Sequence, residues 1–244
     1  NAIHGSPGED GKIQAYLELL GIPQTACDFY QAALTYNKRD LLSVLKPYGI
    51  AMAKSYYLNF GDPINKEAII KKVGLPCFVK ANRSGSSYGI SKVYTSDQIE
   101  AALEIAFKED KEVIIESALM GREVSVGVIQ YQGKTKVLPI TEILSENDFF
   151  DYQAKYEGKS TEITPADLEP ELEDKIIAVA TFIYNTLNLK GFTRSEFILV
   201  NNVPHLLEVN TTPGMTQHSI LPQQAKEAGI SLPELFESAL LAIL

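Results

Sequence analysis

Cysteine and tryptophan are nearly absent from this sequence, which has two cysteines and no tryptophan. Cys27 and Cys77 lie far apart and lack the spacing of metal ligands, so nothing in the pattern indicates a cysteine metal centre. Cys77 sits in an apolar run, where a free thiol packs as a small hydrophobic group. We therefore expect both cysteines to be reduced and buried in a cytosolic protein.

Basic residues are also scarce relative to acidic ones. Twenty-two lysines and arginines stand against thirty-one aspartates and glutamates, which gives a net charge of −9 at pH 7. Such a charge disfavours binding to nucleic-acid phosphates and anionic lipids, so we expect neither a nucleic-acid nor a membrane partner. With 45% apolar residues and no apolar run long enough to cross a bilayer, the 244-residue chain predicts a soluble protein of one or two domains.

The beginning of the chain lacks the features of a natural N-terminus. Asn1 stands where an initiator methionine or a signal peptide is expected, and a glycine-rich turn follows at once. We therefore expect that an N-terminal stretch of the first domain precedes these residues in the whole protein.

Hydrophobic periodicity predicts a mixture of helices and strands. Helices are expected after the loop 5–11, after the capping-box sequence 95–98, from Ser231 onward, and at 38–48, 66–73 and 170–188. Strands are expected at 76–80, 90–94, 112–116, 123–130, 136–143, 192–200 and 205–210. No internal repeat is present, and the order of these elements predicts an α+β fold with mainly antiparallel sheets.

The last two predicted strands form a hairpin that carries charged residues. Side chains alternate along a strand, so Arg194 and Glu196 share one face, and Glu208 and Asn210 share a face of the partner strand. A hairpin centred near Asn202 places Glu196 opposite Glu208 and Arg194 opposite Asn210. Two facing carboxylates repel each other unless a cation lies between them.

This cluster indicates a magnesium site. Mg²⁺ takes oxygen ligands, and the two glutamates with the Asn210 amide oxygen form such a set. A solvated outer face with an arginine–glutamate surface pair is the alternative, because antiparallel sheets commonly have polar faces. The loop 211–219 that follows favours the metal site: Gly214 permits a close approach of the backbone to a ligand, and the loop brings N–H groups and hydroxyls next to a metal-bound phosphate.

A second polar cluster follows the apolar strand that ends at Lys80. Residues 82–89 are rich in glycine and serine and resemble a loop that cradles phosphate. The segment lacks the Gly-Lys-Ser/Thr ending of a P-loop, so it does not belong to that class of nucleotide binder. Ordinary hairpin loops have the same composition, and the neighbouring lysine is the feature that favours a phosphate role.

Two further pairs of residues are candidates for substrate contacts. Lys155 and Tyr156 lie in a long connection of weak periodicity, and connections of that length are often lids over a site. An exposed loop with a solvated lysine is the alternative. His4 and Glu9 flank a helix N-terminus, which favours a substrate carboxylate, whereas capping and surface charge explain them without a ligand.

Five separated motifs together resemble the D-alanine:D-alanine ligases, in the same order and with the same spacing. The resemblance covers the whole chain apart from the expected missing beginning. The motifs are His4-Gly5-x-x-Gly8-Glu9-Asp10-Gly11, Gly85-Ser86-Ser87-x-Gly89, Asp151-Tyr152-x-Ala154-Lys155-Tyr156, Glu208-x-Asn210-Thr211-x-Pro213-Gly214-Met215-Thr216 and Ser219 to Pro222.

The resemblance implies an ATP-grasp fold, in which two α+β subdomains hold ATP between mainly antiparallel sheets. It implies the end of an α/β N-terminal substrate-binding domain at 1–26, a central ATP-grasp subdomain at 27–116 and a C-terminal catalytic subdomain at 117–244. Members of the family join two D-alanine molecules into D-alanyl-D-alanine for peptidoglycan, through a D-alanyl phosphate intermediate. The resemblance also implies a cytoplasmic homodimer.

Roles for individual residues follow from the resemblance. Glu196, Glu208 and Asn210 match the ligands of Mg²⁺ or Mn²⁺, with two ions bound, and Arg194 and the Gly214 N–H match the oxyanion stabilisers. The other matches are Lys80 and Lys155 with the nucleotide phosphates, Ser87 with the nucleotide, Glu116 and Glu123 with adenine and ribose, His4, Glu9, Ser219 and Met215 with the amino-acid substrates, and Ser86 and Tyr156, together with Glu123, with closure of the lid.

The chain departs from the family pattern at three positions. Leu42 stands where the family generally has a nucleotide-contacting lysine, Glu196 where aspartate is usual, and Ala81 where proline is common. The alternatives are a D-alanine:D-lactate ligase, another carboxylate–amine ligase of the ATP-grasp fold, or a non-catalytic nucleotide-binding module. Tyr156 favours the dipeptide product, and the presence of Arg194 with all the metal ligands favours catalysis.

Overall fold

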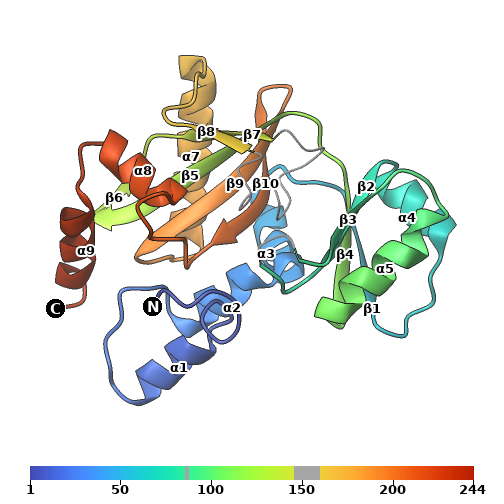
Figure 1. Cartoon of the computed structure of the whole chain (residues 1–244), viewed down its shortest axis with the longest axis horizontal. Helices are drawn as coiled ribbons and strands as arrows, with labels where there is room; N and C mark the ends of the chain where they lie inside the picture. Colours follow the sequence, from blue (N-terminus) through green and yellow to red (C-terminus); the bar gives the residue numbers. More distant parts are fainter. Residues whose placement is uncertain (86–87, 146–159) are drawn as a thin grey trace. The chain divides into compact units, whose positions relative to one another are not determined.

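The computed structural model describes residues 1–85, 88–145 and 160–244 (Figure 1). The chain divides into two compact units, the terminal unit of Asn1–Tyr36, Gly121–Leu144 and Thr161–Leu244, and the central unit of Asn37–Met120 and Ser145–Ser160. The boundaries of these compact units differ from those of the predicted domains 1–26, 27–116 and 117–244. The predicted domains describe functional roles, and they stay a prediction. No described helix is long and apolar enough to cross a membrane.

The central unit contains a four-stranded antiparallel sheet, and two of its helices, α4 and α5, pack on one face of that sheet. Its strands lie in the order β1-β4-β2-β3. The strands are β1 (Ser55–Asn59), β2 (Cys77–Ala81), β3 (Ile90–Val93) and β4 (Glu112–Ser117), and the helices are α3 (Lys38–Leu45), the 3-10 turn η1 (Lys46–Tyr48), α4 (Lys66–Val73) and α5 (Gln98–Glu109).

Alternation along β2 separates the two faces of this sheet. Cys77 and Val79 are fully buried in the core under α4 and α5. Phe78 and Lys80 point to the opposite face and are only partly buried. The predicted phosphate-binding lysine therefore lies on the face of the sheet that these two helices leave open.

The terminal unit is a six-stranded sheet in the order β10-β9-β5-β7-β8, with β6 paired to β5. Helix α7 packs along β5 and β10, and α8 and α9 pack against β5. The strands are β5 (Arg122–Tyr131), β6 (Lys134–Val137), β7 (Thr141–Ser145), β8 (Ser160–Ile163), β9 (Phe192–Val200) and β10 (Val203–Asn210), and the helices are α1 (Lys12–Leu19), α2 (Phe29–Tyr36), α7 (Pro170–Thr186), α8 (Ile220–Glu227) and α9 (Leu232–Leu241).

The hairpin of β9 and β10 turns through two asparagines. Asn201 and Asn202 have φ of 50° and 59°, and Val200 pairs with Val203 on either side of them. Asparagine tolerates this left-handed conformation, and a two-residue turn of this hand follows the twist of the strands. The predicted turn is confirmed.

A β-bulge sets the pairing farther along this hairpin. The register next to the turn, continued unchanged, would put Glu196 opposite Leu207. An irregularity between Leu206 and Glu208 adds one residue, so that Glu208 pairs with Glu196 and Asn210 pairs with Arg194. The predicted cross-strand pairs are confirmed, but they depend on the bulge, because the turn is centred between residues 201 and 202 and not on Asn202.

One predicted strand was wrong, and some helices and strands of the structure were not predicted. The single strand predicted at 136–143 is two strands, β6 and β7, interrupted at Pro139, which has no N–H to donate to a sheet ladder. The elements β1, β8, α2 and α8, which are four to eight residues long, were not predicted, because short segments without a clear apolar pattern are hard to separate from loops. The capping box that opens α9 is confirmed, with reciprocal hydrogen bonds between Ser231 and Glu234.

Both cysteines are free and buried, as predicted. Cys27 Sγ donates to the Lys190 carbonyl at 3.1 Å and accepts from the Lys190 N–H at 3.2 Å. Burial raises the pKa of the Cys27 thiol to about 12. Cys27 therefore joins two parts of the terminal unit as a neutral packing group.

Replacement of Ile115 in β4 by alanine should destabilise the central unit. Ile115 is fully buried in its core, and deletion of such a side chain costs about 2–5 kcal/mol of the free energy of unfolding. Ile105→Ala is the matched control, because Ile105 on α5 is 46% exposed and should cost less than about 1 kcal/mol. Urea unfolding followed by circular dichroism measures both variants, and equal losses would contradict the assigned core.

Candidate functional site

Three neighbouring strands of the terminal unit place the predicted site residues in two rows on one face of the sheet. Directly paired residues of adjacent strands share a face, and residues two apart on one strand share it too. Strands β5, β9 and β10 thus form the rows Ser125–Glu196–Glu208 and Gly127–Arg194–Asn210. The predicted metal ligands and the predicted oxyanion arginine therefore lie next to one another.

Glu196 has one bonded and one unbonded carboxylate oxygen. Arg194 Nε donates to Glu196 Oε1 at 2.7 Å, and Ser125 Oγ makes a longer hydrogen bond of 3.4 Å to the same oxygen. Glu196 Oε2 is buried and has no hydrogen-bond partner in the described part of the chain. A buried carboxylate oxygen without a donor costs free energy, which a cation in contact with it would recover.

Arg194 is a fixed cation surrounded by carboxylates. Burial by itself lowers the pKa of the Arg194 guanidinium, but the charges of Glu196, Glu208 and Glu162 outweigh burial and raise the pKa above its ordinary value. The arginine, with its side chain 16% exposed, therefore offsets the repulsion between the facing carboxylates.

Glu162 on β8 was not predicted from the sequence. Gln223 Nε2 donates to Glu162 Oε2 at 2.9 Å and to the His218 carbonyl at 2.8 Å. Burial raises the pKa of the Glu162 carboxyl, and the hydrogen bond from Gln223 and the charge of Arg194 act in the opposite direction. Gln223 thus connects β8 to the loop that precedes α8.

Gln224 supports the row that contains Glu196, and it too was not predicted. Its side chain is fully buried, and Nε2 donates to the Ser125 carbonyl at 2.8 Å and to Thr141 Oγ1 at 3.0 Å. Gly127 leaves room for it, because a Cβ at that position would lie 2.5 Å from Gln224 Oε1. No signal in the sequence marks this contact, since it depends on which face of α8 packs against β5.

The loop after β10 brings Gly214 close to Ser219. Thr216 bonds to Ser219 Oγ through both its N–H (3.2 Å) and its hydroxyl (2.8 Å). A Cβ on Gly214 would lie 2.7 Å from the same oxygen. Asn210 Oδ1 accepts from the Thr212 N–H at 2.8 Å, which orients the amide at the start of the loop.

Met215, in contrast, packs against the apolar cluster of Ile129, Leu138 and Leu221. The structure therefore gives its side chain a packing partner, and its contact with substrate stays a prediction.

In the central unit, Lys80 is paired with a predicted nucleotide residue. Lys80 Nζ lies 2.8 Å from Glu116 Oε2, and their side chains are 13% and 4% exposed. Lys80 Nζ also lies 5.4 Å from the centroid of the Phe78 ring, a cation–π contact on the same face. The sequence predicted both charged residues but not that they form an ion pair.

His4 and Glu9 are brought together near the N-terminus of α1. Glu9 Oε2 accepts from the Gly5 N–H at 3.0 Å, and Glu9 Oε1 lies 3.5 Å from His4 Nδ1. A Cβ on Gly8 would lie 1.9 Å from the Ile3 carbonyl oxygen, so the loop requires glycine there. The loop thus holds the Glu9 carboxylate in one orientation.

Four predicted site residues lie outside the described residues: Ser86, Ser87, Lys155 and Tyr156. Glu116 belongs to the central unit, and Glu123, on β5, belongs to the terminal unit, so each is described within its own unit. Leu42 is 1% exposed in α3 and belongs to the core, in agreement with its exclusion from the nucleotide contacts.

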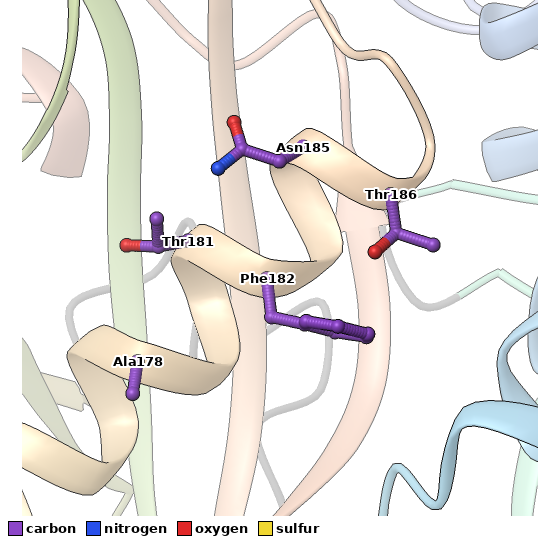
Figure 2. Close-up of a pocket in the computed structure, with 5 residues that line it drawn as sticks. All are labelled: Ala178, Thr181, Phe182, Asn185 and Thr186. Carbon is purple, nitrogen blue, oxygen red and sulfur yellow. The ribbon is translucent and has the colours of Figure 1, made fainter.

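Two other observations concern possible ligand sites among the described residues. The described residues contain no group of three or more His, Cys, Asp or Glu side chains that could hold a metal ion, so the predicted metal site relies on two carboxylates and an amide. A surface pocket on α7 contains no predicted site residue (Figure 2). It is lined by Ala178, Thr181, Phe182, Asn185 and Thr186.

Comparison with known proteins gives the family. The sequence model of the protein family described as D-ala D-ala ligase C-terminus matches residues 44–241 of this chain. The chain belongs to the D-alanine:D-alanine ligase family. It is 65% identical to the D-alanine–D-alanine ligase of Flavobacterium johnsoniae over 98% of this chain and 74% of that protein. The ligase of Christiangramia forsetii is 60% identical over 100% of this chain and 75% of its own length.

Solved structures of this ligase family share the fold. The D-alanine–D-alanine ligase of Bacillus anthracis complexed with ATP matches with a TM-score of 0.85 and 30% identity, over 98% of this chain and 76% of that one. The VanG D-Ala:D-Ser ligase of Enterococcus faecalis matches with a TM-score of 0.87 and 34% identity, over 100% and 71%. The predicted α+β ATP-grasp fold is confirmed.

The raised pKa of Glu162 gives a test of the site's electrostatics. A raised pKa means that the folded protein binds this proton more tightly than the unfolded chain, so the carboxyl stabilises the fold below its ordinary pKa, and the contribution is lost as pH rises through the raised value. Arg194→Met should raise the pKa of Glu162 further, because a nearby positive charge is removed. Carbon-13 NMR of the carboxyl measures this shift.

Arg122→Met is the control for that titration, because Arg122 pairs with Glu142 at 2.6 Å and is not among the groups that act on Glu162. An unchanged Glu162 pKa in Arg194→Met, or equal shifts in both variants, would show that the arginine does not face this carboxyl.

Proposed function

We propose that this chain is an ATP-dependent, ADP-forming ligase that joins two D-alanine molecules into D-alanyl-D-alanine for peptidoglycan synthesis. The observation that carries the proposal is the convergence of Arg194, Glu196, Glu208 and Asn210 on two paired strands. Relatives at 60–65% identity that bear the name D-alanine–D-alanine ligase support the same substrate.

The reaction has two steps in this proposal. The carboxylate of the first D-alanine attacks the terminal phosphate of ATP, which yields D-alanyl phosphate and ADP. The amine of the second D-alanine then attacks the acyl carbon, and the tetrahedral intermediate expels phosphate and forms the peptide bond. Arg194 and the Gly214 N–H stabilise the oxyanion of this intermediate, since preorganised donors act where negative charge develops.

A divalent cation fits the donor set of the hairpin. Glu196 Oε2 is buried and unbonded, because the Arg194 and Ser125 donors are both directed to Oε1. Glu208 and the Asn210 amide oxygen complete a set of hard oxygen donors. Magnesium or manganese held by these residues would neutralise charge on the transferring phosphoryl group. We propose two ions, as the family resemblance implies.

On the nucleotide side, we assign Lys80 and Lys155 to the phosphates, Glu116 and Glu123 to adenine and ribose, and Ser87 to the nucleotide without a more specific contact. The pairing of Lys80 with Glu116 holds the ammonium in place before the nucleotide binds. A phosphate bound to Lys80 would share the ammonium group with the Glu116 carboxylate. Because binding would then weaken the Lys80–Glu116 ion pair, the net binding free energy would be smaller than for an unpaired lysine.

On the amino-acid side, the proposal assigns His4, Glu9, Ser219 and Met215 to the two D-alanines, and Ser86 and Tyr156, with Glu123, to closure of the lid. Glu9, oriented by the Gly5 N–H, suits a substrate ammonium group, and the Ser219 hydroxyl beside Gly214 suits a substrate carboxylate. A closed lid would keep water from the acyl phosphate.

Ligases of the same fold differ in their second substrate. The match to a D-Ala:D-Ser ligase extends over the whole chain, so the fold alone does not select the second substrate. We propose the dipeptide product on the basis of Tyr156 and the curated relatives. Domain roles at 1–26, 27–116 and 117–244, and assembly as a homodimer, belong to the same proposal.

Phosphate release should depend on D-alanine. With ATP, Mg²⁺ and D-alanine, the protein should release phosphate and form D-alanyl-D-alanine, as measured by a coupled phosphate assay and mass spectrometry. D-lactate or D-serine together with limiting D-alanine, and L-alanine alone, serve as comparison substrates. Preferential release with D-lactate or D-serine would reject the proposed substrate, and no release with any of them would favour a non-catalytic module.

Removal of the Arg194 guanidinium should reduce turnover. Arg194→Met should lower kcat by roughly 10²–10³-fold, because one oxyanion donor typically contributes that much. Arg122→Met, a control with the same change on the same sheet, should retain most of the activity. Steady-state kinetics with varied ATP and D-alanine measure both, and a kcat within threefold of the unmodified protein would remove Arg194 from the chemistry.

A further inference from the structure

The peptide that joins His218 to Ser219, just before α8, is held on both sides by hydrogen bonds. The Ser219 N–H donates to the Thr216 carbonyl at 2.9 Å. The His218 carbonyl accepts from Gln223 Nε2 at 2.8 Å. Because both of its hydrogen-bonding groups are paired, this peptide has a fixed orientation, and the Ser219 side chain leaves the backbone from a fixed point.

The Ser219 hydroxyl is not used to cap the helix that follows it. Ser219 is the N-cap residue of α8, but its side chain makes no capping hydrogen bond. An N-cap serine usually accepts from an N–H two or three residues farther on, and Pro222, at the third position, has no N–H. The hydroxyl instead bonds to Thr216, at 3.2 Å to the N–H and 2.8 Å to the hydroxyl, so it stays within the loop.

Gln223 fixes the His218 carbonyl because Glu162 fixes Gln223. The same Nε2 donates to the His218 carbonyl and, at 2.9 Å, to Glu162 Oε2. A carbonyl and a carboxylate are both acceptors, so only the nitrogen end of the Gln223 amide can face the two of them. A hydrogen bond to a carboxylate is stronger than one to a neutral acceptor. Glu162 therefore holds the amide, and the amide holds the loop.

The next residue anchors the same turn of α8 to the sheet. Gln224 donates to the Ser125 carbonyl on β5 and to Thr141 Oγ1 on β7. Thr141 Oγ1 in turn lies 2.7 Å from Thr164 Oγ1, directly after β8. Any shift of the start of α8 would leave buried polar groups without partners, so this helix gives Gln223 a rigid base.

The two-step reaction proposed above identifies the carboxylate that suits the Ser219 hydroxyl. The first D-alanine gives its carboxylate to the phosphoryl group and then to the peptide bond. The second D-alanine reacts through its amine and keeps its carboxylate until the product leaves. A hydroxyl that binds a substrate carboxylate during peptide-bond formation therefore binds that of the second D-alanine.

We propose that Gln223 and Glu162 are positioning residues for the second substrate, which hold the peptide before Ser219 so that the serine hydroxyl meets the carboxylate of the incoming D-alanine. This inference rests on the proposed function. Neither side chain contacts the substrate: Gln223 acts through the His218 carbonyl, and Glu162 acts through Gln223. Glu162 thus acts here as a hydrogen-bond acceptor and not through the effect of its charge on Arg194.

Removal of the Gln223 amide should weaken the second substrate selectively. Initial rates over a wide range of D-alanine concentrations give separate KM values for the two D-alanines, and varied ATP gives a third. Gln223→Met should raise the KM of the second D-alanine about tenfold, as expected for the loss of about one oriented hydrogen bond, and leave the other two within twofold. Gln130→Met is the control, because Gln130 Nε2 donates to Thr135 Oγ1, between β5 and β6, and should change none of them.

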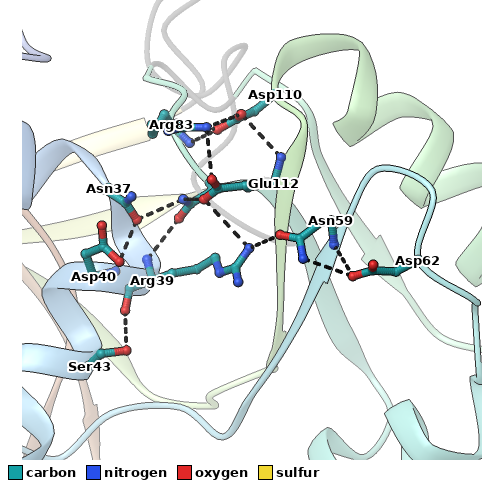
Figure 3. A network of polar contacts seen from close by, with 10 residues as sticks. Asn37, Arg39, Asp40, Ser43, Asn59, Asp62, Arg83, Asp110 and Glu112 are labelled. Atoms are coloured by element: carbon teal, nitrogen blue, oxygen red, sulfur yellow. Dashed lines mark hydrogen bonds and ion pairs between the residues drawn. The ribbon is translucent and has the colours of Figure 1, made fainter.

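Two replacements of Glu162 separate its role as an acceptor from its charge. Glu162→Gln removes the charge and keeps an oxygen that can accept from Gln223, whereas Glu162→Met removes both. Glu162→Met should therefore match Gln223→Met, and Glu162→Gln should stay within threefold of the unmodified protein. Asp62→Leu is the control: Asp62 also accepts from a side-chain amide, that of Asn59 at 3.0 Å, but in a turn of the central unit (Figure 3).

Equal impairment by Glu162→Gln and Glu162→Met would show that the charge is what matters, and it would overturn the inference. Equal rises of all three KM values in Gln223→Met, which a merely structural role would give, would overturn it as well. Both results would leave the proposed function intact. An unmodified protein that forms no product from D-alanine would instead contradict the proposed function itself.

A second measurement needs no variant. In a crystal structure with ADP and D-alanyl-D-alanine, the free carboxylate of the dipeptide, which comes from the second D-alanine, should lie about 3 Å from Ser219 Oγ. Gln223 Nε2 should still be bonded to Glu162 and to the His218 carbonyl. A carboxylate bound elsewhere, or a Gln223 amide released from Glu162 in the complex, would overturn the inference.

Discussion

The pairing of β9 with β10 after the bulge is the constraint on which the site depends. Side chains alternate along a strand, so a shift of one residue moves Glu208 and Asn210 to the opposite face of the sheet. The bulge at Leu206 and Glu208 supplies that one residue between the asparagine turn and the site. The turn therefore sets the strand pairing at the end of the hairpin, and the bulge sets the pairing at the site. Both are needed to give the observed rows of residues.

The charges of the residues brought together by this pairing then determine which ligand the site can bind. Two facing glutamates are unfavourable by themselves, and Arg194 offsets part of their repulsion through its 2.7 Å contact with Glu196 Oε1. The contact leaves Glu196 Oε2 buried and unbonded, which a divalent cation would correct. The proposed catalytic role of Arg194 and the stability of the site thus depend on the same balance, because this arginine lies beside carboxylates that need a second positive charge. The network around Ser125 and Gln224 keeps this balance in one geometry.

The sequence predicted the parts of this arrangement that follow from local periodicity and from motifs. Strand alternation was sufficient to place Arg194 and Glu196 on one face, and the family motifs led to the correct fold. The bulge was not predictable, because no residue type marks it. The contacts of Glu162 and Gln224 were missed because they depend on which faces of β8 and α8 pack against the sheet. Pro139, which splits a predicted strand, did carry a readable signal.

The most direct test of the central claim is a crystal structure with Mn²⁺ and a non-hydrolysable ATP analogue, in which anomalous scattering locates the metal. We expect a manganese ion roughly 2 Å from Glu196 Oε2, with Glu208 and Asn210 as further ligands, and with Arg194 still bonded to Glu196 Oε1. Manganese bound elsewhere, or Glu208 and Asn210 on the opposite face of the sheet from Glu196, would contradict it.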